Sequence, residues 1–241
     1  MKLLAIDTSG PAMSCAVVAE GRVVCLVAMH RALTHSETIM PAVDQALSAA
    51  GLSCADMDCF VAVAGPGSFT GVRIGVCAVK GLAHAAGKPC ARVNALEALA
   101  MNFSGFDGLA CPVLDARRGQ VYCAAYDMRS GLPETVLAPD ALPLSDFLGK
   151  LPPDRRLMFM GDGVGVYEAA LRELGTIAPM HLRDIRADAA CALAEARRAE
   201  WMCAAQLTPI YLRAPQAERE RRAGRDHTKK LRQQRAEEAR R

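Results

Sequence analysis

GPGSFTGVRIG, at residues 65–75, decides the fold of this 241-residue chain. It follows an apolar run at 60–64, which is typical of a buried parallel strand. Its glycines and proline predict a sharp turn, and Ser68 or Thr70 then caps a helix that runs to about residue 86. Strand, glycine turn and helix form half of a βαβ unit, so this stretch predicts an α/β protein.

The helix after the turn carries a stripe of small residues. Gly71 and Gly75 lie one turn apart, and Ala78 and Val79 continue the stripe. Because a glycine costs a helix about 1 kcal/mol relative to alanine, two of them indicate that another backbone approaches closely. That neighbour is either an element of the same domain or a second chain, and the stripe is compatible with both.

Length and composition fit a globular protein of one large or two small domains, since 51% of the residues are apolar and 23% are charged. Asp7 interrupts the apolar N-terminus too early for a signal peptide, and no apolar run is long enough to span a membrane. The ten cysteines form no C-x-x-C pair, and the five histidines lack ligand spacing. We therefore expect a cytoplasmic chain with reduced thiols, no metal site and no membrane partner.

Hydrophobic patterning predicts two halves that begin with the same order of elements. The first half has strands at 3–7, 13–19, 23–29, 60–64 and 90–93, with helices at about 36–50, 69–86 and 94–101. Thr34 and Glu37 are spaced as a capping box for the first helix. The second half has strands at 109–114, 120–126, 135–138 and 157–160, with helices at 145–149, 165–174 and 187–205. This β-β-β-α-β-α-β-α order indicates a duplicated unit with an eroded second copy, so we expect lobes at 1–105 and 106–213.

The remaining residues, 214–241, form a basic tail. Residues 216–241 hold ten Arg and Lys against five Asp and Glu, a surplus of five positive charges. Apolar residues are nearly absent, so the tail is expected to be solvated and flexible. The alternative is that its charge attracts tRNA.

Asp7, Thr8 and Ser9 end the first strand with a carboxylate and two hydroxyls. In a duplicated protein of this order, that position resembles the first phosphate loop of the superfamily of actin, sugar kinases and chaperone ATPases. There the carboxylate holds Mg²⁺ through water, and hydroxyls or backbone N–H groups cradle phosphate. A turn closed by an Asx-type hydrogen bond would have the same sequence.

The matching loop of the second half does not look like a phosphate loop. At 115–120 it carries Arg117 and Arg118 where small hydroxyl residues are expected. The glycines at 161–165 lie where that superfamily packs adenosine, but any tight turn between a strand and a helix would look similar. A complete ATPase site is therefore not expected.

These motifs together resemble the bacterial TsaB (YeaZ) family, over residues 1 to about 213. The resemblance rests on AIDTS at 5–9, HSE at 35–37 leading into Ile39-Met40-Pro41, and the glycine turn with its KGLA continuation at 80–83. LDARRGQVY at 114–122 and PIYLR at 209–213 complete it. The glycine-turn segment is the most specific of these motifs.

The resemblance implies an actin-like fold of two lobes (the ASKHA superfamily, whose lobes are ribonuclease-H-like) and a role in making threonylcarbamoyladenosine. Members work with a catalytic paralogue, TsaD, and an ATPase, TsaE, which modify the adenosine 3′ of a tRNA anticodon. The paralogue binds its metal through an H-x-x-x-H motif that this sequence lacks. We therefore expect a non-catalytic accessory subunit that meets tRNA indirectly, through the complex.

The same resemblance implies pairing through the N-terminal lobe, as a homodimer when alone or with TsaD. Any ATP or ADP would then bind at the composite interface, and Asp7, Thr8 and Ser9 would be vestigial. Gly75→Leu is expected to keep the fold and weaken pairing. The residues expected at the interface are Ser68, Phe69, Thr70, Gly71, Val72, Ile74, Gly75, Ala78 and Val79.

Two other functions remain compatible with the sequence. One is an ATP-binding phosphotransferase or ATPase of the actin-like superfamily, which the altered loop at Arg117 and Arg118 disfavours. The other is an RNA-binding protein that works through its basic tail. Magnesium-dependent ATP turnover by the chain alone supports the first, and loss of tRNA binding on truncation after Arg213 supports the second.

Overall fold

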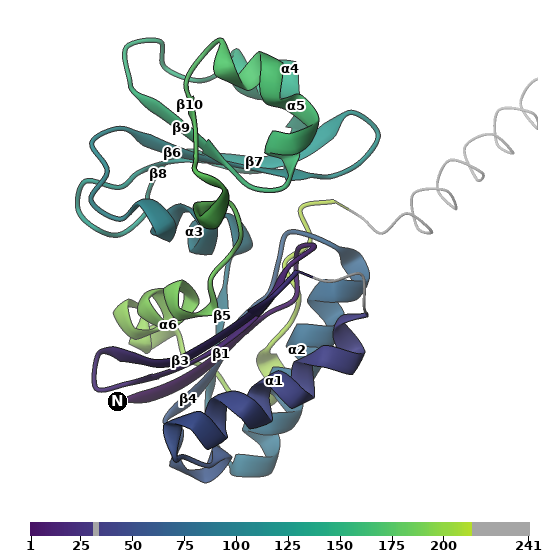
Figure 1. Cartoon of the computed structure of the whole chain (residues 1–241), viewed down its shortest axis with the longest axis vertical. Helices are drawn as coiled ribbons and strands as arrows, with labels where there is room; N and C mark the ends of the chain where they lie inside the picture. The colour runs from purple at the N-terminus through teal and green to yellow at the C-terminus, as the bar shows by residue number, and fades with distance from the viewer. Residues whose placement is uncertain (31–33, 214–241) are drawn as a thin grey trace, which may run out of the picture. The chain divides into compact units, whose positions relative to one another are not determined.

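A computed structural model describes residues 1–30 and 34–213 of the chain (Figure 1). The predictions for the basic tail, 214–241, lie outside the described residues. Within the described ranges, no helix combines the length and the apolar character needed to cross a membrane.

The first lobe is built on a five-stranded sheet with the order β3-β2-β1-β4-β5. β1 pairs antiparallel with β2 and parallel with β4, so the sheet is mixed. Helices α1 and α2 lie along one face of it, as Figure 1 shows. The elements are β1 (Lys2–Asp7), β2 (Met13–Ala19), β3 (Arg22–Met29), α1 (His35–Ala50), β4 (Cys59–Val63), α2 (Phe69–Ala86), β5 (Cys90–Val93) and α3 (Ala95–Ala100).

The second lobe repeats this topology on a sheet of order β8-β7-β6-β9-β10, which confirms the predicted duplication. Erosion of the second copy is also visible, because α4 has 5 residues against 16 in α1, and β10 has 2 against 4 in β5. The elements are β6 (Leu109–Asp115), β7 (Gln120–Asp127), β8 (Glu134–Pro143), α4 (Leu144–Leu148), β9 (Leu157–Met160), α5 (Gly163–Arg172), β10 (Thr176–Ile177) and α6 (Ala187–Ala196).

The last helix of each repeat packs on the sheet of the other repeat. α3 contacts β6 and β7, whereas α6 contacts β1, β2 and β4. The predicted second lobe, 106–213, is therefore wrong at its C-terminal end, because the chain from Ala187 onward returns to the first sheet. Where the two helices meet, the Arg197 guanidinium donates to both carboxylate oxygens of Glu97 at 2.7 and 2.9 Å.

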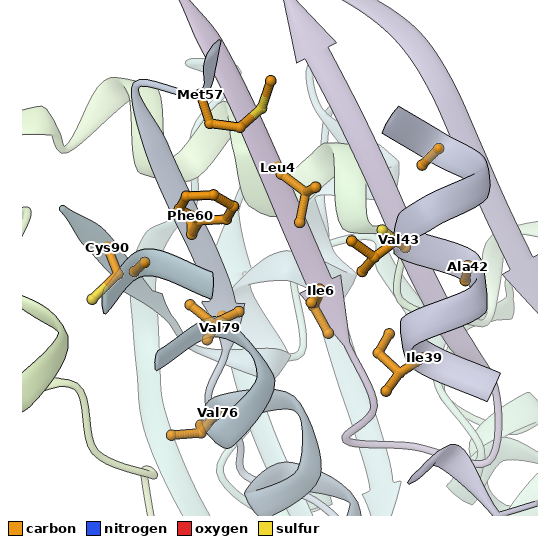
Figure 2. Close-up of a cluster of buried hydrophobic side chains, with 14 of the residues drawn as sticks. Leu4, Ile6, Ile39, Ala42, Val43, Met57, Phe60, Val76, Val79 and Cys90 are labelled. Atoms are coloured by element: carbon orange, nitrogen blue, oxygen red, sulfur yellow. The ribbon is translucent and has the colours of Figure 1, made fainter. Parts of the chain in front are cut away.

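The core of the first lobe lies between its sheet and the pair α1 and α2 (Figure 2). Leu4 and Ile6 alternate along β1 and are fully buried against this helical layer. Ile39 of α1 and Val76 of α2 supply apolar side chains from the helices. The intervening residues of β1 face the other side of the sheet, which α6 covers.

The glycines of α2 pack against the loop after β1 in the same chain. A Cβ on Gly71 would collide with the backbone oxygen of Thr8, and a Cβ on Gly75 would lie 2.5 Å from the Thr8 hydroxyl oxygen. The close neighbour is thus an element of the same domain. The expectation that Gly75→Leu keeps the fold is wrong, since Thr8 is itself fully buried.

Of the two predicted side-chain caps, the one on α2 is present and the one on α1 is absent. Ser68 caps α2, because its hydroxyl accepts a hydrogen bond from the N–H of Gly71 at 3.2 Å. Thr34 stands at the N-cap of α1 but makes no side-chain capping bond. Its hydroxyl instead accepts from the Ser36 hydroxyl at 3.3 Å, so the predicted capping box is absent.

Gly71 and Gly81 lie in different environments on α2, so we expect their substitution by alanine to change the free energy of unfolding in opposite directions. Gly71→Ala is expected to lower the free energy of unfolding by about 1–3 kcal/mol, because its methyl group would overlap Thr8. Gly81→Ala is expected to raise it by about 0.4–1 kcal/mol, because Gly81 is exposed in mid-helix with open space around it. Urea denaturation of both variants measures these changes, and a neutral Gly71→Ala would contradict the packing.

Candidate functional site

The loop after β1 uses its polar groups inside the fold. Asp7, Thr8 and Ser9 are 1%, 0% and 1% exposed. The Asp7 carboxylate accepts hydrogen bonds from the Ser9 N–H at 2.9 Å and the Ser9 hydroxyl at 2.6 Å. The Thr8 hydroxyl donates to the Gly71 carbonyl at 2.7 Å. The loop therefore forms the Asx-type turn that the sequence left open, and it anchors α2.

Burial also changes the electrostatics of Asp7. Loss of hydration raises the pKa of its carboxyl to about 6 against the opposing effect of the Ser9 hydrogen bonds, and the nearby charge of Asp184 adds to the rise. With this pKa the carboxyl is mostly ionised at neutral pH and becomes protonated as the pH falls below about 6.

The space beside Asp7 is too small for a phosphate group. Residues from both lobes enclose a cavity of about 10 Å³, which is room for about one water molecule. Asp162 and Asp184 add two further carboxylates to its wall, and Arg183 adds a guanidinium. Among residues 1–30 and 34–213, no group of three metal-ligating side chains comes together. The described residues thus do not fit a magnesium nucleotide at this loop.

The corresponding loop of the second lobe is a tight, internally bonded turn. Arg117 and Arg118 have positive φ angles of 64° and 58°, and Gly119 follows at 72°. Asp115 holds this turn, because its carboxylate accepts the Arg117 N–H at 2.8 Å and pairs with the Arg117 guanidinium at 3.3 Å. The two arginines thus occupy the turn where a phosphate loop would need small residues.

The glycines predicted to resemble an adenosine site have a packing role here. A Cβ on Gly161 would collide with the carbonyl of Val113, and one on Gly163 would lie 2.9 Å from a methyl group of the same residue. Between them, Asp162 accepts the N–H of Asp115 at 3.0 Å, and burial raises the pKa of its carboxyl. This turn therefore fastens α5 to β6.

The expected interface residues on α2 divide into two groups. Gly71, Val72, Gly75 and Val79 are buried inside the chain and cannot form an exposed contact face. Their burial arises because α2 presents this side to β1 and β4. The remaining members of the predicted set are exposed or partly exposed: Ser68, Phe69, Thr70, Ile74 and Ala78.

Sequence analysis missed the residues that continue this exposed side. Arg73, Cys77 and Gly81 are exposed and follow Phe69 at intervals of four, so these four residues form one row along α2, which we call the α2 row. The Arg73 guanidinium lies 3.8 Å from the centre of the Phe69 ring. The sequence shows the i, i+4 spacing of the α2 row, but it also shows the spacing of the small-residue stripe on the same helix. Only the packing of α2 against the sheet shows that the stripe is buried and the row is exposed.

Comparisons with known proteins agree with this geometry. A family model described as TsaD, tRNA N6-adenosine threonylcarbamoyltransferase, matches residues 29–221. The chain is 39% identical over 178 residues to the tRNA threonylcarbamoyladenosine biosynthesis protein TsaB of Bacillus subtilis, which covers 73% of this chain and 78% of that protein.

Solved structures similar to this chain also include a member of the YeaZ family. YeaZ from Pseudomonas aeruginosa superposes with a TM-score of 0.74 at 28% identity, covering 88% of this chain and 99% of that one. The ethanolamine utilization protein EutJ from Carboxydothermus hydrogenoformans has a TM-score of 0.52 at 11% identity, covering 79% of this chain and 89% of that one, which shows the fold alone. With the repeated topology, these neighbours establish the actin-like α/β fold. The chain belongs to the TsaB family of tRNA threonylcarbamoyladenosine biosynthesis proteins.

Proposed function

We propose that this chain is a non-catalytic subunit of the machinery that makes threonylcarbamoyladenosine in tRNA, and that it supports a catalytic protein of the TsaD type. The observation that carries the proposal is the internal use of Asp7, Thr8 and Ser9. In a working phosphate loop these groups would face a ligand. Here they secure α2, so the loop supports a binding surface instead of a reaction.

The α2 row is the surface that we assign to the partner. A partner helix can approach closely at Gly81, because an exposed glycine with open space around it leaves the backbone uncovered. Glycine in mid-helix is unfavourable by about 1 kcal/mol, and no contact within the described residues offsets that cost at Gly81. Phe69 and Arg73 add an aromatic ring and a guanidinium, which are side chains enriched at interfaces.

The same surface serves the other assemblies that the resemblance implies. When the catalytic protein is absent, two copies of this chain would pair through it, and TsaE would join as the ATPase of the complex. At the Asp7 loop, ATP or ADP would bind only in a composite site completed by the partner, since the cavity beside Asp7 holds about 10 Å³. That volume also counts against the rival function, a stand-alone ATPase of the same fold.

Substitution of Gly81 tests the partner surface. Gly81→Gln is expected to reduce co-purification of the catalytic protein at least about tenfold, because the new side chain holds the partner helix away. Gly165→Gln is the matched control, since Gly165 is also an exposed glycine in a helix with open space, but on α5 of the other lobe. Tagged chains and mass spectrometry of the captured proteins provide the measurement.

The results of this experiment distinguish a failure of the proposed function from a failure of the proposed partner surface. If both variants recover the protein with the H-x-x-x-H motif as well as wild type does, the partner uses another surface. If wild type recovers no such protein, the subunit proposal fails.

Asp7→Asn tests whether Asp7 is structural. The folded-state pKa of about 6 lies above the unfolded value of about 3.9, so wild type loses stability as pH rises from about 4 to about 6 and then levels off. Asn keeps the oxygen that accepts from Ser9 but does not titrate. The free energy of unfolding of the variant minus that of wild type should rise by about 2 kcal/mol between pH 4 and pH 7. If the free energies of unfolding of wild type and Asp7→Asn change with pH in the same way, the buried environment of Asp7 is contradicted.

A further inference from the structure

A groove of about 500 Å³ lies on the first lobe, where α2 ends and β5 begins. Its other wall is the chain that follows α6. The volume falls within the range of about 300–1,000 Å³ that is usual for small-molecule sites. The lining residues are Ala83, His84, Gly87, Lys88, Pro89, Trp201, Met202, Cys203, Ala204 and Gln206.

Hydrogen bonds fix both walls of this groove. Met202 and Cys90 form an antiparallel bridge with two backbone hydrogen bonds of 2.8 Å, which ties the C-terminal wall to β5. The Trp201 indole N–H donates to the carbonyl of Ala194 at 2.8 Å, so the ring is held at its polar edge. The Lys80 ammonium group donates to the carbonyls of Ala205 and Leu207 at 3.3 and 3.0 Å. The groove is therefore preformed.

The lining combines a lysine and a histidine with an aromatic ring. His84 and Lys88 come from the end of α2, and no Asp or Glu is among the lining residues. Trp201 contributes an aromatic ring, which has the Arg198 guanidinium 5.4 Å from its centre, and Gln206 contributes an amide that can pair with polar ring edges. A ligand that matches all three features has a planar ring joined to an anion.

We propose that this groove binds a nucleotide, with the base against Trp201 and the phosphate beside Lys88 and His84. Base stacking on aromatic side chains and phosphate pairing with Lys are the usual contacts for such a ligand. The nucleotide is either free or part of an RNA strand, and both present the same chemistry. The groove shares no lining residue with the Asp7 loop or the α2 row, so ligand binding can be tested on the chain alone, without the partner of the proposed function.

Trp201 is the only tryptophan in the chain, so its fluorescence and its single indole N–H signal in NMR spectra report on this groove directly. Titration of the full chain with AMP or with a short oligoadenylate is expected to change both signals saturably. Adenosine and inorganic phosphate, which each lack half of the ligand, are expected to bind at least about tenfold more weakly. A response to the oligoadenylate but not to AMP assigns the site to an RNA strand, and a response to AMP assigns it to free nucleotide.

Variants of the cationic wall complete the test. Lys88→Ala and, independently, His84→Gln are expected to weaken AMP or oligoadenylate binding, by about tenfold for the lysine. Lys150→Ala, an exposed lysine beyond α4 in the other lobe, is the matched control and should bind as wild type does. The proposal is overturned if neither AMP nor the oligoadenylate moves the Trp201 signals. It is also overturned if adenosine binds as well as AMP, or if Lys88→Ala binds like wild type.

Discussion

The contact between Thr8 and the glycine face of α2 is the constraint on which the rest of the first lobe depends. The Thr8 hydroxyl donates to the Gly71 carbonyl at 2.7 Å, and the two glycines let the helix backbone approach the loop after β1. That approach sets the distance between α2 and the sheet, and the apolar side chains in Figure 2 fill the space that remains. It also determines which side of α2 is left exposed, so the α2 row that we propose as the partner surface is a consequence of this packing.

Exchange of the last helices joins the two repeats. Each of α3 and α6 buries its apolar side on the sheet of the other repeat. Where they meet, Arg197 and Glu97 form a bidentate, partly buried pair, and the hydrogen bonds to Glu97 are the main reason why the pKa of Arg197 is raised. Such a pair is costly to break on one side alone, because the remaining charge would stay buried without a partner. This pair is one of several hydrogen-bonded contacts between the repeats, since Asn102 also donates to the carbonyls of Leu182 and Asp184.

Compared with the phosphate loops that the resemblance leads one to expect, the corresponding loops of this chain use their polar groups and glycines inside the fold. Asp7 and Ser9 bond to each other, Asp115 holds its own turn, and the glycines near Asp162 pack against β6. This change accords with a subunit that supports a catalytic paralogue. The groove beside Trp201 lies apart from these loops, on a wall that only the return of the chain to the first sheet creates.

The sequence by itself determined the duplication, the family, the order of the elements apart from β10, and a cap at Ser68 or Thr70, because these follow from local patterns and spacing. The sequence also indicated that the loops at Asp7 and Arg117 do not form a complete ATPase site. Tertiary structure alone decided which neighbour the glycine stripe meets, that α6 crosses back to the first sheet, and that Trp201 and Lys88 line one groove. The physical reason is that a helix pattern shows which residues share a side, whereas burial of that side depends on elements distant in the chain.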